Sequence, residues 1–377
     1  MSRVLGDRSR GTTDKRFVTV HGDCPDFRGE VRENGTVPLG RSRGRRIFRR
    51  ETARKTRQSP ACERLQRFVF HRAAGLLVVL SAVAWGAASN AVGQAKKELP
   101  DPYDIAGNDL LTPDGVALRA TFFPSAKGKN AVPVILLHSW KGSRKEFATL
   151  ASTLWQAGHA VLVPDLRGHG QSTSQGGREL VASRIGPADI ALMVQNDMET
   201  LKNFLVKKNN AEELNIEKLC LVGAEMGATV AANWTVLDWS WPQYPGVKQG
   251  QHVKAVVLLS PERNFRGVGM EEFLRNPLLN QFVSIYILFG NADPKVASRT
   301  ELIYSTLAKL HPEPPEGQGE QEKTLFFKGL DTKVQGSKLL AQRGLNVEQR
   351  IEKFIQLRLV AKDYPWREVG KKSGAAK

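Results

Sequence analysis

Short apolar runs alternate with longer amphipathic stretches along most of the chain after residue 96. A strand that is covered on both faces reads as a continuous apolar run, so each of these runs predicts a buried strand. Such strands are expected at residues 132–137, 160–163, 218–222, 255–259, 283–289 and 324–327. A hairpin is expected over residues 111–118, with its turn at Pro113-Asp114-Gly115.

The stretches between the apolar runs predict helices. They cover residues 144–156, 189–205, 226–239, 296–310 and 347–357, with a shorter helix near 270–275. Strands that alternate with helices favour an α/β protein with a mostly parallel twisted sheet and helices on both faces. In such a sheet, functional groups are expected on loops at the carboxyl edge of the strands.

Some segments are expected to lie outside this framework. Residues 237–251 predict a compact loop whose Trp239, Trp241 and Tyr244 could cover a site and, with Trp140, form an aromatic pocket wall. The Pro- and Gly-rich residues 312–321 predict a flexible surface loop. Between residues 259 and 283 the chain is too short for a lid domain, so no large lid is expected.

A different pattern precedes the predicted α/β part. Arg64, Arg67 and Arg72 are followed by an apolar run over residues 73–88, and small residues then occur at the spacing of a cleavage site, ending at Ala91 or Ala95. This combination is typical of a secretory signal peptide, and the run is shorter than the roughly 20 residues of a membrane-spanning helix. We therefore expect export to the periplasm or the exterior without a stable membrane anchor. Anchoring by an uncleaved signal is the alternative.

The predicted organisation has four parts. Residues 1–63 are a disordered basic extension or a mispredicted start, 64–95 the signal peptide, 96–362 the α/β domain and 363–377 a basic flexible tail. No Met occurs between Met1 and Met193, so translation from the signal would need an alternative start codon near Leu65 or Val69.

The net charge of +17 is unevenly distributed. Residues 1–95 hold 19 Lys or Arg and 8 Asp or Glu, whereas the remaining 282 residues hold 36 and 30. Most of the positive excess thus precedes the α/β domain, and no nucleic-acid partner is expected for the mature domain. The Arg-rich residues 41–50 would favour nucleic acid only if they are translated.

The cysteines predict neither a disulfide nor a metal site. After cleavage only Cys220 remains, in an apolar run where a small buried side chain is expected. No Cys/His spacing of a metal site occurs, and no cofactor is expected.

Motifs along residues 104–359 resemble those of the α/β-hydrolase fold superfamily, which includes serine hydrolases and esterases. They are Leu136-Leu137-His138-Ser139-Trp140-Lys141-Gly142, residues 158–172 with Asp165-Leu166-Arg167-Gly168-His169-Gly170, Gly223-Ala224-Glu225-Met226-Gly227 and Phe289-Gly290-Asn291-Ala292-Asp293-Pro294. The resemblance implies the α/β-hydrolase fold in a capless form. It also implies that Ser139, Trp140 and Met226 line an oxyanion hole or pocket.

The third motif resembles the nucleophile elbow of the superfamily, a tight turn from a strand into a helix whose central side chain points into the pocket. Gly223, Ala224 and Gly227 suit such a crowded turn. At the central position, where the superfamily usually has Ser, this chain has Glu225. The helix N-terminus favours a carboxylate there, and the carboxylate would fill the oxyanion hole.

The resemblance places the catalytic His after the last strand, where this chain has Gln335-Gly336 and no later His. Gln cannot exchange a proton near neutral pH as His does. Asp293 is retained at the acid position, and before Pro294 it is expected to cap the following helix. A further hypothesis is that the Gln335 amide bridges Asp293 and Glu225.

Other candidates for acid–base chemistry are weaker. His138 and His169 are expected to be structural, and His252 and His311 to face solvent. Lys333 could act as a base near the pocket mouth if its pKa were depressed.

Two functions remain open. The first is an exported, non-catalytic relative of serine hydrolases that binds an unknown small molecule or a protein partner. The alternative is a hydrolase or lyase for small ester- or amide-type substrates, with Glu225 in place of the serine nucleophile.

Overall fold

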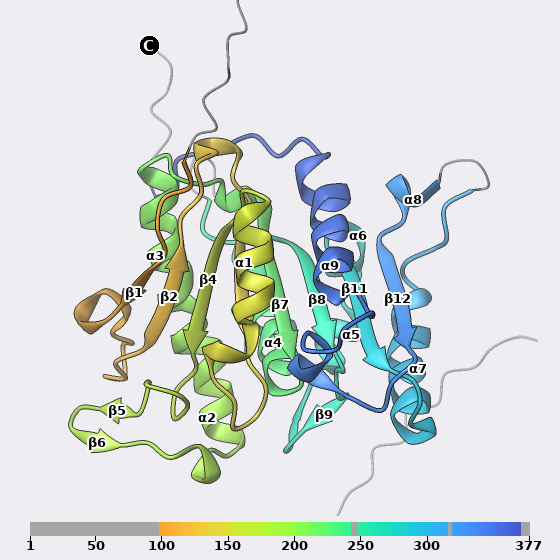
Figure 1. Ribbon diagram of the computed structural model, residues 1–377, viewed down its shortest axis with the longest axis horizontal. Coiled ribbons are helices and arrows are strands. Elements are labelled where there is room, and N and C mark those ends of the chain that lie inside the picture. The colour runs from red at the N-terminus through yellow and green to blue at the C-terminus, as the bar shows by residue number, and fades with distance from the viewer. Residues whose placement is uncertain (1–97, 243–247, 316–318, 371–377) are drawn as a thin grey trace, which may run out of the picture. The chain divides into compact units, whose positions relative to one another are not determined.

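An eight-stranded sheet forms the centre of the computed structural model, which describes residues 98–242, 248–315 and 319–370 (Figure 1). Its strand order is β1-β2-β4-β3-β7-β8-β11-β12. The strands from β4 to β12 run parallel, whereas β2 is antiparallel to both of its neighbours. The strands are β1 (Tyr103–Ile105), β2 (Arg119–Phe123), β3 (Pro133–Leu137), β4 (Ala160–Asp165), β7 (Leu219–Ala224), β8 (Val253–Leu259), β11 (Ser284–Gly290) and β12 (Leu325–Leu330).

The predicted mostly parallel sheet is therefore confirmed, with all six predicted strands present as β3, β4, β7, β8, β11 and β12. Two small antiparallel hairpins accompany it, β5 (Ser174–Gln175) with β6 (Arg178–Glu179) and β9 (Asn264–Phe265) with β10 (Val268–Gly269). The predicted turn at residues 113–115 also forms, since the Gly115 N–H donates to the carbonyl of Thr112 (2.9 Å) and Leu111 pairs with Ala117.

Helices cover both faces of the sheet, because alternate side chains of each central strand point to opposite sides. Ile135 and Leu137 of β3 belong to the core under α3, α4 and α7, whereas Val134 and Leu136 belong to the core under α1 and α9. Figure 1 shows α1 and α9 in front of the sheet. The helices are α1 (Ala148–Gln156), α2 (Pro187–Leu192), α3 (Met198–Asn210), α4 (Met226–Ser240), α5 (Glu271–Arg275), α6 (Pro277–Phe282), α7 (Pro294–Ala308), α8 (Gly319–Glu322) and α9 (Val347–Ile355).

The predicted helices are present with shifted ends. The helix expected over 189–205 is α2 and α3 joined by a π-helical turn at Met193–Asp197, and residues 144–147 form a 3₁₀ turn before α1. Part of the loop expected over 312–321 is helical, as α8. No lid domain lies between β8 and β11 in the described chain, where β9, β10, α5 and α6 follow one another closely.

The expectation that residues 237–251 cover a site is wrong for the described residues. The helix α4 continues to Ser240, and a 15-residue helix is about 22 Å long, so it carries the chain back to the amino edge of the sheet. There the Trp239 indole N–H donates to the carbonyl of Val253 (2.9 Å), the first residue of β8, and the ring stacks on Phe282. Tyr244 lies outside the described residues.

The ends of the chain bear on two further expectations. The predicted extension and signal peptide, residues 1–95, lie outside the described residues. In the described part of the predicted flexible tail, the chain is instead held against α3. Asn209 donates to the carbonyl of Arg367 (2.8 Å), and Asn210 exchanges hydrogen bonds with the backbone of Val369 (2.9 and 3.0 Å). No described helix is long and apolar enough to cross a membrane.

Candidate functional site

Glu225 occupies a strained turn between β7 and α4. Its φ of 49° and ψ of −105° are unusual for a residue with a side chain. The turn is fixed by backbone bonds: the Glu225 N–H donates to the carbonyl of Leu259 (3.0 Å), and its carbonyl accepts from Ala228 and Thr229. The turn is also crowded, because a Cβ on Gly227 would overlap the carbonyl of Leu137. The small residues that predicted a tight turn are thus required by close backbone contact.

The Glu225 side chain is half-buried and lies against Gly336, where a Cβ would come within 2.6 Å of its Oε1. Within the described chain, no hydrogen bond or ion pair holds this carboxyl. Burial raises its pKa above the usual value, and the nearby carboxylates of Glu146 and Glu262 raise it further. Lys338, which is exposed, opposes them.

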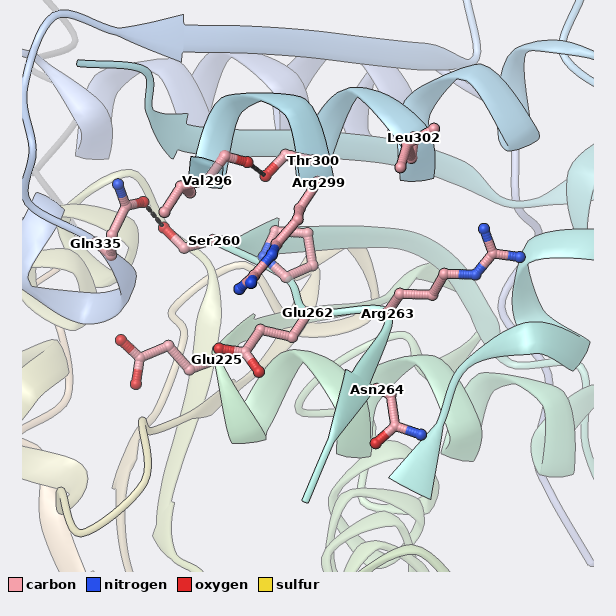
Figure 2. A pocket seen from close by; sticks show the side chains of 11 residues that line it. Glu225, Ser260, Glu262, Arg263, Asn264, Val296, Arg299, Thr300, Leu302 and Gln335 are labelled. Atoms are coloured by element: carbon pink, nitrogen blue, oxygen red, sulfur yellow. Dashed lines mark hydrogen bonds between the residues drawn. The ribbon is translucent and has the colours of Figure 1, made fainter. Parts of the chain in front are cut away.

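Gln335 does not bridge Glu225 and Asp293, so that hypothesis is wrong. Its Oε1 accepts from the Ser260 hydroxyl (2.7 Å) and the Gly290 N–H (3.1 Å), and its Nε2 donates to the Gly290 carbonyl (2.8 Å). The last residue of β11 presents both a donor and an acceptor, and the Gln amide complements them. In Figure 2 the Gln335–Ser260 bond lies above the Glu225 carboxylate, and no hydrogen bond joins Gln335 to it.

Asp293 caps a helix, as expected from its place before a proline. Its Oδ1 accepts from the backbone N–H of Lys295 (2.9 Å) at the start of α7, where Pro294 occupies the first turn. Asp293 does not line the cavity that opens beside Glu225. Lys333 is exposed and does not line it either.

The residues predicted for an oxyanion hole lie near the turn but make other contacts. The Ser139 N–H donates to Glu146 (3.0 Å), and its hydroxyl is bonded to Ser337 (3.0 Å). Trp140 is half-buried, with the Arg266 guanidinium 4.4 Å above its ring. The side chain of Met226 is fully buried in the core. None of these three predicted residues lines the cavity beside Glu225.

A cavity of about 350 Å³ opens beside Glu225 at the carboxyl edge of the sheet (Figure 2). Residues from the end of β8 and from α7 form most of its wall. The lining residues are Glu225, Ser260, Pro261, Glu262, Arg263, Asn264, Val296, Arg299, Thr300, Leu302 and Gln335.

Sequence reasoning missed most of this wall. Ser260 is the clearest omission, since it binds Gln335 and also accepts from the Gly336 N–H (2.8 Å). A signal was present, because Ser260-Pro261-Glu262 directly follows a predicted strand and polar residues at that edge are functional candidates. Nothing in the sequence indicated that Arg299 lines the cavity, because this residue lies in the middle of a helix.

No histidine lines the cavity among the described residues. His138 and His169 are structural, as expected: His138 Nδ1 bonds the Ser139 carbonyl (2.8 Å) and its Nε2 accepts from the Leu166 N–H (3.0 Å). Burial lowers the pKa of both rings, to about 4 for His169.

The expectation that His252 and His311 face solvent is wrong. They are 0% and 4% exposed, and burial lowers the pKa of both, to about 4 for His311. His311 lies between Thr324 (2.8 Å) and Asn280 (2.6 Å). Asn280 belongs to α6, a helix that was not predicted, which explains why the cover over His311 was not foreseen.

Cys220 is buried, as predicted, and burial raises the pKa of its thiol. In the ranges that the structure describes, no three or more His, Cys, Asp or Glu side chains are placed to hold a metal ion.

Comparison with known proteins agrees with this architecture. A family model described as alpha/beta hydrolase fold matches residues 132–286. No curated protein matches the sequence. Among solved structures, the chain is similar to an esterase from Pyrococcus furiosus, with 16% identity over 69% of this chain and 91% of that one and a TM-score of 0.48.

An esterase from Pyrobaculum calidifontis is 14% identical, with 72% and 87% of the two chains covered and a TM-score of 0.49. A dienelactone hydrolase from Anabaena variabilis is 17% identical, with 70% and 100% covered and a TM-score of 0.45. These similarities assign no activity to the chain.

Proposed function

We propose that this protein, which has the α/β-hydrolase fold, is an exported, non-catalytic relative of serine hydrolases that binds a small molecule in the cavity beside Glu225. The observation that carries the proposal is the Gln335 amide, which is held by Ser260 and Gly290 where the superfamily has a proton-exchanging imidazole.

The geometry at Glu225 supports its assignment to the nucleophile position. A residue with positive φ, between a strand and a helix and flanked by crowded glycines, is the arrangement that exposes a nucleophile at the top of such a sheet. A serine there would be activated by a neighbouring base. Glu225 has no hydroxyl to activate, and its carboxylate would repel the negative charge that develops in acyl transfer.

The missing base is the second support. A general base must lie within hydrogen-bond reach of the group that it deprotonates and must titrate near the working pH. Gln335 does not titrate, and every described histidine is buried away from the cavity wall. Loss of one triad member typically costs about 10⁴- to 10⁶-fold in rate, and these losses do not add.

Export is the part of the proposal that rests on sequence alone. The basic flank, the apolar run over residues 73–88 and the small residues after it support a cleaved secretory signal. N-terminal sequencing of the protein from culture supernatant or periplasm tests this. A chain that begins near residue 92 or 96 is expected, and a mature cytoplasmic chain that retains residues 64–95 would contradict it.

Ester hydrolysis tests the non-catalytic assignment. With short p-nitrophenyl esters, the purified protein is expected to show no turnover above the buffer blank, because it lacks both nucleophile and base. The double variant Glu225→Ser with Gln335→His is expected to gain turnover, whereas each single variant is expected to remain inactive since the two groups act together.

The alternative function is hydrolysis through Glu225 itself, which its unpartnered carboxyl and raised pKa favour. Turnover by the unmodified protein that disappears in Glu225→Gln would establish this alternative and overturn the non-catalytic proposal. Glu301→Gln, on the exposed side of α7, is the matched control, because it makes the same chemical change outside the cavity.

A further inference from the structure

Four polar side chains of the cavity wall are already engaged within the protein. Ser260 and Gln335 bind each other (2.7 Å), and the Thr300 hydroxyl donates to a carbonyl of its own helix (2.9 Å). Arg263 forms a two-point ion pair with a surface glutamate, Glu271. These side chains therefore complete the wall and have little capacity left for a ligand.

The Glu225 carboxyl differs from these groups. It is half-buried and has no partner in the described chain, although removing a carboxylate from water is costly unless a charge or hydrogen bonds compensate. The neighbouring Glu146 and Glu262 add negative potential instead of relieving it. A cation placed in the cavity would compensate the two carboxylates that line it, Glu225 and Glu262.

An aliphatic surface completes the cavity. Pro261, Val296 and Leu302 line it, and Figure 2 shows Leu302 and Glu225 at opposite ends. A volume of about 350 Å³ is within the usual range for small-molecule sites. The shape suits a ligand with one charged end and a short aliphatic body.

The basic residues of the wall do not reverse this preference. Arg263 is neutralised by Glu271, and Arg299 is exposed, so water and salt screen its charge. The half-buried Glu225 carboxylate is less screened than the exposed Arg299 guanidinium. An anionic ligand would meet a like charge there.

We propose that the cavity binds a small organic amine, whose ammonium group pairs with Glu225 and whose aliphatic body lies against Pro261, Val296 and Leu302. This inference rests on the proposed binding function and names its ligand class.

Calorimetric titration of the full chain with n-hexylammonium, n-hexanoate and n-hexanol tests the proposal. Hexylammonium is expected to bind at least about tenfold more tightly than either analogue, which corresponds to one charge-assisted hydrogen bond of about 1.4 kcal/mol. Glu225→Gln is expected to weaken hexylammonium binding by about tenfold or more, whereas Glu301→Gln leaves it unchanged.

The pH dependence gives a second measurement in the unmodified protein. Hexylammonium binding is expected to strengthen as the pH rises through the elevated pKa of Glu225, since only the carboxylate form pairs with the ammonium. Glu225→Gln is expected to lose this dependence while keeping its thermal stability.

Three results would overturn the proposal: equal binding of hexanoate, unchanged hexylammonium binding in Glu225→Gln, or no hexylammonium binding up to about 10 mM. None of these would restore catalysis, so the non-catalytic assignment would stand. Conversely, ester turnover that depends on Glu225 would overturn the non-catalytic assignment, whether or not hexylammonium binds.

Discussion

Gly227 leaves no space for a side chain where α4 approaches β3. A Cβ there would overlap the Leu137 carbonyl oxygen and lie 2.8 Å from that of His138. Both are backbone atoms and cannot rotate aside. Gly227→Ala is therefore expected to lower the free energy of unfolding by about 3 kcal/mol, as overpacking at a rigid contact does. Urea denaturation followed by circular dichroism measures the change.

Gly269→Ala is the matched control, since the nearest atom to its Cβ would be 3.8 Å away. A change of about 0.5 kcal/mol or less is expected. If both variants were equally stable, the close approach of α4 to β3 would not be a constraint on this fold.

Among single residues, those with a role set by their own backbone were predictable. Glu225 follows an apolar run between small residues, and Asp293 precedes Pro294, so both local environments could be inferred. The bonding of Gln335 could not, because its partners Ser260 and Gly290 lie 75 and 45 residues away along the chain.

The N-terminus of α7 allows a test that separates two roles of Asp293. As a helix cap, Asp293→Ala is expected to cost about 1 kcal/mol of unfolding free energy, whereas Asp293→Asn should change it by only a few tenths, because Asn caps nearly as well. Thermal denaturation of both variants measures this.

A catalytic acid would behave differently. In the active double variant Glu225→Ser with Gln335→His, a catalytic Asp293 could not be replaced by Asn without loss of turnover. If Asp293→Ala had the same free energy of unfolding as the unmodified protein, Asp293 would not act as a helix cap.

Strands buried at every position were predictable, whereas β1, β2 and α6 were not. The strand β3 is buried at all five positions and reads as a continuous apolar run. In β2, buried and half-buried positions alternate over only five residues, and β1 has only three residues. Apolar patterns this short also occur by chance outside strands, so neither strand could be predicted. The helix α6 has six residues, too few for a helical period to be distinguished.

For the molecule as a whole, buried histidines are expected to make folding sensitive to acid. Every described histidine has a pKa below its usual 6.5, to about 4 for His159, His169 and His311. The unfolded chain therefore binds more protons between about pH 6.5 and 4, and stability falls as the pH is lowered through this range.

Two buried carboxyls oppose this trend. Burial raises the pKa of Asp197 and Asp238 to about 6, so the folded state binds their protons first and gains stability on acidification. The five histidines outnumber them by three, and each proton difference is worth about 1.4 kcal/mol per pH unit, so a net loss of at most roughly 4 kcal/mol per pH unit is expected near pH 5. Urea titrations at several pH values measure it, and constant or rising stability below pH 6.5 would contradict the prediction.

The backbone turn at residue 225 is held without help from the side chain that it presents. Its hydrogen bonds join main-chain atoms, and its crowding involves glycines on either side. Substitutions at this one position can therefore alter the chemistry offered to the cavity without changing the fold. During evolution, a protein with such a turn can lose or regain an activity while every intermediate sequence still folds.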